Sequence, residues 1–199
     1  MIEKIRSLVW LDYCMAILTD FKRLGLLLSR HTFIPATLVF PVLAAFTDII
    51  ALYRAFETGR SFFVSLSYGF LLLALINIIS AWLGASLLTT AVESSAESPS
   101  LSRNFSIVNI TFAFRLFVLP LVTIMASISF APAAFLFLGY IGAGVAGILC
   151  SAYCISTIYS LPHGKSIMLV IVPHLVFATA QFLLFVLGIL YLVRLASLA

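Results

Sequence analysis

Charged residues are scarce in this chain. Only 9% of its 199 residues are Asp, Glu, Lys or Arg, whereas an ordinary soluble domain carries about 25%. So few charges cannot cover a surface that faces water, because a small domain leaves most of its residues at least partly exposed. The scarcity argues against a soluble enzyme, a disordered tail and a free nucleic-acid-binding protein. We therefore expect an integral membrane protein.

Cysteine is scarce as well, with three residues at positions 14, 150 and 154. Three cysteines cannot form a disulfide framework, and none of them belongs to a C-x-x-C pair. Cys150 and Cys154 lie four residues apart in an apolar run, so they share one face of a helix. Buried, small apolar side chains explain them better than a redox or metal site. A disulfide-rich secreted module is excluded.

Motifs that carry catalysis or bind cofactors are missing from the sequence. It contains no H-E-x-x-H for a zinc peptidase and no Walker A motif. Gly142-Ala-Gly144-Val-Ala-Gly147 matches G-x-G-x-x-G, but it lies inside an apolar run, where a dinucleotide site is not expected. The three histidines show no paired placement that indicates haem or quinone binding. We expect no enzymatic activity, cofactor, metal or soluble nucleotide.

Long hydrophobic runs are what the chain has in abundance, since 63% of its residues are hydrophobic and 18 are Phe. A helix of about 20 apolar residues crosses the hydrocarbon core of a bilayer. Polar breaks, chiefly the hydrophilic segment Glu93–Asn104 and the turn Pro162–Lys165, divide the chain into five such stretches. The expected spans cover residues 33–53, 62–92, 105–130, 133–161 and 166–193. The predicted fold class is all-α, a polytopic integral membrane protein with five transmembrane helices in a domain from 31 to 199.

Residues 1–30 form an N-terminal leader with an amphipathic pattern. Projected at about 100° per residue, its apolar side consists of Leu8, Leu11, Cys14, Met15, Leu18 and Leu26. Charged residues lie on or near the opposite side. This pattern predicts an interfacial helix on the membrane surface, with a solvated helix as the alternative. Lys4 and Lys22 fall on the apolar side and would have to snorkel.

Orientation follows from the distribution of Lys and Arg. With the N-terminus inside, seven basic residues lie on the inner side and three on the outer side, and Arg115 lies within a span. The inner set is Lys4, Arg6, Lys22, Arg23, Arg30, Arg103 and Lys165. Cytoplasmic loops carry the excess of positive charge, so we expect a cytoplasmic N-terminus and a C-terminus outside.

Arg115 lies near the middle of the third expected span. An unpaired Arg at that depth costs about 2.5–3.5 kcal/mol on insertion scales, so it needs a partner or a wet cavity. Pro120 frees the carbonyl of Leu116 as one acceptor, and Asp48 is the nearest counter-ion by depth. Asn77 and Gln181 are neutral alternatives at mid-depth in their own spans. Two interpretations stay open: a polar functional site in the bundle, or an Arg that fixes helix packing. The intramembrane polar candidates are Asp48, Asn77, Arg115, His174 and Gln181.

Small residues recur every four positions in the fourth expected span, at Gly139, Ala143, Gly147 and Ser151. Such a face lets another helix approach closely and gain van der Waals contact. We expect it to be a helix-packing face, either within the bundle or against a partner chain.

Three segments carry a family likeness. The leader ends in Phe21-Lys-Arg-Leu, the third span contains Phe114-Arg-Leu-Phe-Val-Leu-Pro120-Leu, and the turn before the last span reads Tyr159-Ser-Leu-Pro-His163-Gly164-Lys165-Ser. From about Asp20 to Val193 the chain resembles short bacterial members of the Yip family, the Ypt/Rab-interacting five-span membrane proteins. The resemblance implies five spans and a non-enzymatic protein. Rab binding is not implied, because eukaryotic members carry a longer hydrophilic N-terminal region, and Arg115 departs from the family pattern.

The expected function is that of a non-catalytic multi-pass protein: a scaffold, an organiser or an accessory subunit of a larger membrane complex. Its expected partners are membrane lipids and other membrane protein subunits, and no nucleic acid. The alternative is a small permease or channel component with a polar path near Arg115, where prolines could break the spans. Since the sequence shows no long targeting extension, we expect the inner membrane of a bacterium.

Overall fold

The computed structural model describes residues 12–30, 37–56, 62–96 and 98–176, and in these ranges every regular element is a helix. The all-α prediction is confirmed for them. Three helical stretches, Gly69–Glu93, Leu101–Ser127 and Pro132–Tyr159, are long and apolar enough to cross a membrane. A shorter apolar helix, His163–Val176, follows them. Parts of the first and fifth expected spans, residues 33–36 and 177–193, lie outside the described residues.

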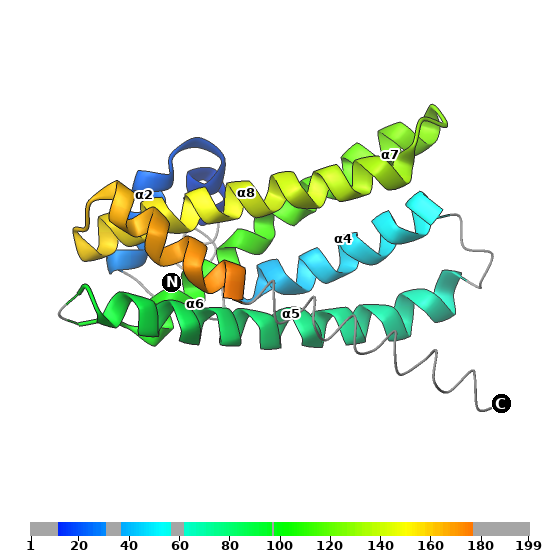
Figure 1. Ribbon diagram of the computed structural model, residues 1–199. Coiled ribbons are helices and arrows are strands. Elements are labelled where there is room, and N and C mark those ends of the chain that lie inside the picture. Colours follow the sequence, from blue (N-terminus) through cyan, green and yellow to red (C-terminus); the bar gives the residue numbers. More distant parts are fainter. Residues whose placement is uncertain (1–11, 31–36, 57–61, 97, 177–199) are drawn as a thin grey trace, which may run out of the picture.

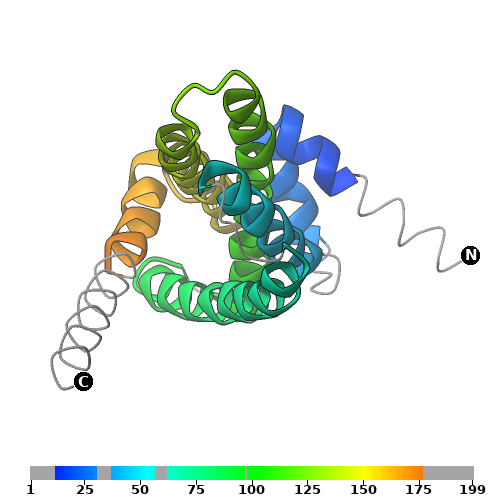
Figure 2. The ribbon, with the colours of Figure 1, turned by 90° about the vertical axis from the view of Figure 1, so that its right-hand side faces the viewer.

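The long helices run side by side along one direction (Figure 1). α4 (Val39–Phe56) packs against α5 (Phe62–Glu93), and on its other side it packs against α7 (Val118–Ser127) and α8 (Pro132–Tyr159), as the view along the bundle in Figure 2 shows. Fully buried alanines lie along α4, at Ala44, Ala45 and Ala51. Small side chains let the neighbouring helices approach closely, so α4 becomes the central helix.

The third expected span is not one uniform α-helix. It consists of α6 (Leu101–Thr111), a 3-10 segment η1 (Phe112–Phe117) and α7. Pro120, in the first turn of α7, has no N–H to donate to the carbonyl of Leu116. A 3-10 helix is wound more tightly than an α-helix, so it changes the direction in which successive side chains point. Arg115 lies on this rewound segment.

The hydrophilic linker is shorter than predicted. The segment Glu93–Asn104 was expected to be an exposed loop, but α5 continues to Glu93 and α6 begins at Leu101. Asn104 is fully buried. Its amide bonds to the hydroxyls of Thr89 and Tyr159, and a polar side chain whose hydrogen bonds are made inside the protein does not need water.

The N-terminal leader contains two helices where one was predicted. Residues 12–19 are helical, α2 covers Phe21–Arg30, and Asp20 lies between them. The Asp20 carboxylate accepts the backbone N–H groups of Lys22 (2.8 Å) and Arg23 (3.2 Å), which is the role of a helix N-cap. Residues on either side of this break therefore do not share one continuous stripe, and residues 1–11 lie outside the described part.

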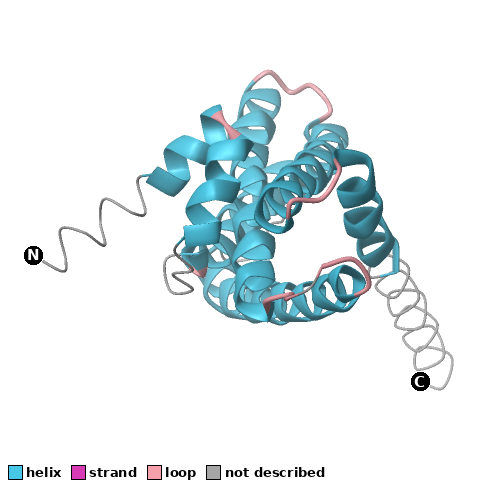
Figure 3. Cartoon of the chain, turned by 90° about the vertical axis from the view of Figure 1, so that its left-hand side faces the viewer, coloured by secondary structure: helices cyan, strands magenta, loops and turns pink. Residues whose placement is uncertain are grey.

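α2 lies across the C-terminal end of α8 (Figure 1). Figure 3 shows the described part from this side as helices joined by loops. Leu24 and Leu28 are fully buried there, while Met15, Leu18 and Leu26, from the predicted apolar side, are 50%, 64% and 46% exposed. The contact is close at Gly25, because a Cβ atom there would lie 2.8 Å from the Cβ of Thr157. The leader thus packs on the bundle with one face and leaves three apolar side chains pointing away from it.

Candidate functional site

The ion pair between Arg115 and Asp48 is the centre of the polar cluster inside the bundle. Nη2 of Arg115 bonds to Oδ2 of Asp48, whose side chain is only 2% exposed. The second carboxylate oxygen, Oδ1, accepts the hydroxyl of Tyr140 at 2.8 Å. Both oxygens of the buried carboxylate are therefore satisfied, as a buried charge requires.

Asn77 extends the cluster to α5. Its side-chain oxygen accepts Nη1 of Arg115 at 3.0 Å, and its amide nitrogen donates to the carbonyl of Pro41 at 3.1 Å. The cluster thus joins α4, α5, η1 and α8. Four helices converge on one guanidinium group, and the rewound segment η1 directs Arg115 toward them.

Aromatic rings cover the guanidinium. The rings of Phe112 and Tyr140 have their centroids 5.3 and 5.4 Å from the Arg115 Cζ atom, within cation–π range. The sequence suggested Asp48, Asn77 and the freed Leu116 carbonyl as alternative partners for Arg115. The structure brings the first two to it at once, and Tyr140 is a member that the sequence did not indicate.

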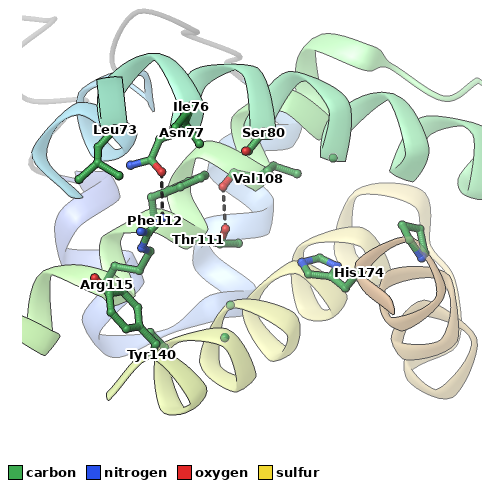
Figure 4. Close-up of a pocket in the computed structure, with 15 residues that line it drawn as sticks. Leu73, Ile76, Asn77, Ser80, Val108, Thr111, Phe112, Arg115, Tyr140 and His174 are labelled. Atoms are coloured by element: carbon green, nitrogen blue, oxygen red, sulfur yellow. Dashed lines mark hydrogen bonds between the residues drawn. The ribbon is translucent and has the colours of Figure 1, made fainter. Parts of the chain in front are cut away.

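A cavity of about 460 Å³ lies beside this cluster, between α5, the α6–η1 segment, α8 and the helix His163–Val176 (Figure 4). Its polar lining comes from Asn77, Ser80, Thr111, Arg115, Tyr140 and His174. The rest of the wall is apolar or glycine. A volume in this range, with a few convergent polar groups in an apolar wall, is typical of small-molecule sites.

His174 reaches this cavity from the last described helix (Figure 4). Its Nδ1 lies 2.8 Å from the carbonyl oxygen of Val170. A carbonyl oxygen only accepts, so in the neutral ring Nδ1 carries the hydrogen, and Nε2 is an acceptor for which the described residues supply no hydrogen bond. Gln181, the remaining polar candidate, lies outside the described residues.

The small-residue face of α8 contacts the α6–η1–α7 segment of the same chain. A Cβ atom at Gly139 would lie 3.1 Å from Val118, and one at Gly147 would lie 3.2 Å from Thr111. Ser151 is fully buried, and Ala143 lines the cavity. Gly142 and Gly144 have open space around them instead, and Gly144 faces the cavity.

A second polar cluster lies near the other end of α6, and it was not predicted from the sequence. Tyr159 donates its hydroxyl to Asn104 (3.1 Å) and accepts the backbone N–H of Ser100 (3.2 Å), while Asn104 donates to Thr89 (2.9 Å). All of these groups are neutral. Asn104 was named from the sequence only as the last residue of the hydrophilic segment, directly before Phe105.

Metal-binding geometry is absent from the described residues, where no three His, Cys, Asp or Glu side chains form a group that could hold an ion. Comparison of the chain with protein-family models, curated proteins and solved structures finds no match. The resemblance to the Yip family therefore stays a prediction from the sequence.

Proposed function

We propose that this protein is a non-catalytic, five-span membrane protein that binds a small molecule in the cavity beside Arg115, in the manner of a permease or carrier component. One observation carries the proposal. The cavity of about 460 Å³ combines an apolar wall with six polar side chains at the point where four described helices meet. Ligand sites in helical membrane proteins commonly form between helices near the middle of the bilayer.

The five-span topology is supported by helix length. α4 has 18 residues, or about 27 Å of helix, and the helix His163–Val176 leads into a stretch that is apolar as far as Val193. The start of α6, α2 and the start of the last described helix lie at the same end of the molecule (Figure 1). These segments carry Lys22, Arg23, Arg103 and Lys165. Under the positive-inside rule this end is cytoplasmic, in a bacterial inner membrane on our proposal.

The scaffold or accessory-subunit role expected from the sequence has less support. Its main argument was a small-residue face that a partner helix could use. Gly139 and Gly147 already contact α7 and α6 of the same chain, so this face is no longer a reason to expect a partner. The geometry favours the binding function.

Gly144 offers a direct test, because it lines the cavity and a Cβ atom added there meets no described atom within 4 Å. Gly144→Leu should occupy part of the cavity and leave the fold intact. Gly142→Leu is the matched control, since Gly142 is on the same helix, is equally open and does not line the cavity. Each variant is purified in mild detergent, and co-purifying small molecules are identified by mass spectrometry.

We expect a molecule that is retained by the wild type and by Gly142→Leu and is lost from Gly144→Leu. If the three preparations carry the same small molecules, and a protein subunit co-purifies with all of them, the accessory-subunit function is correct instead.

A further inference from the structure

The chemistry of the cavity wall points to a class of ligand, and this step rests on the binding function proposed above. We propose that the cavity binds an uncharged lipid with a free hydroxyl group, of which a diacylglycerol is the simplest example. Three properties of the wall lead to this class: its net charge, its hydrogen-bonding groups and its opening.

The wall offers no unpaired charge. Among the described residues that line the cavity, Arg115 alone carries a fixed charge. Its charge is neutralised by the carboxylate of Asp48, which Nη2 bonds, while Nη1 donates to Asn77 and Nε is buried. A phosphate or carboxylate group would have to displace Asp48, or enter an apolar cavity without a counter-ion, and both are costly. An anionic phospholipid headgroup is therefore disfavoured.

The hydrogen-bonding groups favour a hydroxyl. Nδ1 of His174 is engaged with Val170, so Nε2 can only accept from a ligand when the ring is neutral. Ser80 lines the cavity from α5 and can donate or accept. A ligand hydroxyl can donate to Nε2 of His174, whereas a ketone or an ester carbonyl offers nothing to it. Ser80 is a second polar group of the wall, available to another oxygen of the ligand. Figure 4 shows Ser80 and His174 on different helices around the cavity.

The shape of the wall suits a lipid that enters from the side. Gly144 is exposed and lines the cavity, so no side chain of α8 covers the cavity at this position. Leu73, Ile76 and Val108 are among the apolar residues of the wall, and burial of hydrocarbon against such side chains is favourable when it improves packing over the bilayer.

Photolabelling tests the proposal on the full chain in lipid nanodiscs. The probe is a diacylglycerol with a diazirine in one acyl chain. Three unlabelled competitors have the same acyl chains: diacylglycerol, its O-methyl ether, which lacks the hydrogen, and phosphatidic acid, which replaces the hydroxyl with a phosphate. Labelled peptides are identified by mass spectrometry.

Labelling should map to α5, α8 and the helix His163–Val176. Diacylglycerol should compete, its methyl ether should compete about five- to tenfold less well because one hydrogen bond is lost, and phosphatidic acid should not compete at the same concentration. His174→Leu should weaken labelling by the same factor of about five to ten. Gly144→Leu should abolish labelling, while Gly142→Leu should not change it.

Two outcomes overturn the proposal, and they differ in what else they remove. If phosphatidic acid competes as well as diacylglycerol, and Gly144→Leu still abolishes labelling, the cavity is a binding site but its ligand is anionic. If Gly144→Leu and Gly142→Leu label equally, the probe does not enter the cavity, and the proposed binding function fails with the ligand class. Equal unfolding temperatures of the variants and the wild type exclude misfolding as the cause.

Discussion

The described residues form two Arg–Asp ion pairs in different surroundings. Arg115 and Asp48 lie inside the bundle, where their side chains are 27% and 2% exposed. Arg23 and Asp12 lie on the N-terminal helices, 3.7 Å apart, with side chains 58% and 50% exposed. The first pair is held by Tyr140 and Asn77 as well, whereas no further side-chain partner is recorded for the second among the described residues.

The comparison separates what a charge contributes from what its surroundings impose. Water screens the outer pair, so its loss should matter little. The inner pair is different because neither charge can be solvated once its partner is gone. The cost of removing both charges from water offsets much of their attraction, so the intact inner pair adds little net stability. Removing one partner is costly, however, and the pair therefore holds α4 and η1 together. Four substitutions test this difference, from the largest expected effect to the smallest.

Asp48→Ala should have the largest effect. It leaves the Arg115 guanidinium without its counter-ion, and breaking a buried pair in this way costs about 3–5 kcal/mol. The loss is measured as thermal unfolding in detergent and as abundance in the membrane. The double variant Asp48→Ala, Arg115→Leu should recover most of it, because no charge then remains buried. If the double variant is as unstable as the single one, the pair does not act as a unit.

Tyr140→Phe should come next. It keeps the ring that covers Arg115 and removes only the hydroxyl that donates to Asp48 at 2.8 Å. A hydrogen bond to a charged group is worth about 1.5–3 kcal/mol. The same unfolding measurement applies, with the Asp48→Ala background as control. In that background the Tyr140 substitution should add little, since its partner is already absent.

Tyr159→Phe is the counterpart in the neutral cluster. It removes the hydroxyl that bonds to Asn104 and to Ser100. Each bond between neutral groups contributes about 1 kcal/mol, so the loss of two should total about 2 kcal/mol, and the loss per hydrogen bond should be smaller than for Tyr140→Phe. A larger loss per bond than at Tyr140 would mean that the charge on Asp48 does not strengthen its hydrogen bond.

Asp12→Ala should have the smallest effect, below about 1 kcal/mol, because exposed ion pairs are weak. Its small cost should vanish when unfolding is measured at high salt, where exposed charges are screened. The cost of Asp48→Ala should persist at the same salt concentration. Equal salt sensitivity of the two variants would contradict the burial of the inner pair.

Much of the fold follows from hydrophobic periodicity and length. The helical class and the long apolar helices of the described part were predictable, since apolar runs separated by polar breaks have few other solutions. The helix boundaries at the linker were not predictable. Leu101–Asn104 is a polar stretch of sequence, and Asn104 is buried only because it forms hydrogen bonds with Thr89 and Tyr159. The break at Asp20 was not predicted either. The amphipathic pattern continues across it, and only the structure shows that the Asp20 carboxylate caps the start of a new helix.

The sequence predicted candidate residues for the site but not which of them lie together. Asp48, Asn77, Arg115 and His174 were all selected for their depth, since polar groups in a span need partners. Depth does not tell which helices are neighbours, so the sequence could not choose among the partners of Arg115. The sequence did not single out Tyr140 or Ser80, because Tyr is an amphipathic residue that is common in apolar helices and a helical Ser can bond to a carbonyl one turn back.

The sequence alone determined that this chain is helical and apolar and that its few buried charges must be paired. Composition and spacing suffice for this, because hydrocarbon leaves an unpaired charge or backbone group no partner. Only the tertiary structure decided which charges pair, that the small-residue face of α8 contacts its own chain, and that a cavity remains beside Arg115. These features depend on the length of the 3-10 segment η1, which sets the direction of the Arg115 side chain, and on which helices meet there. Both are properties of the packed bundle and of no single helix.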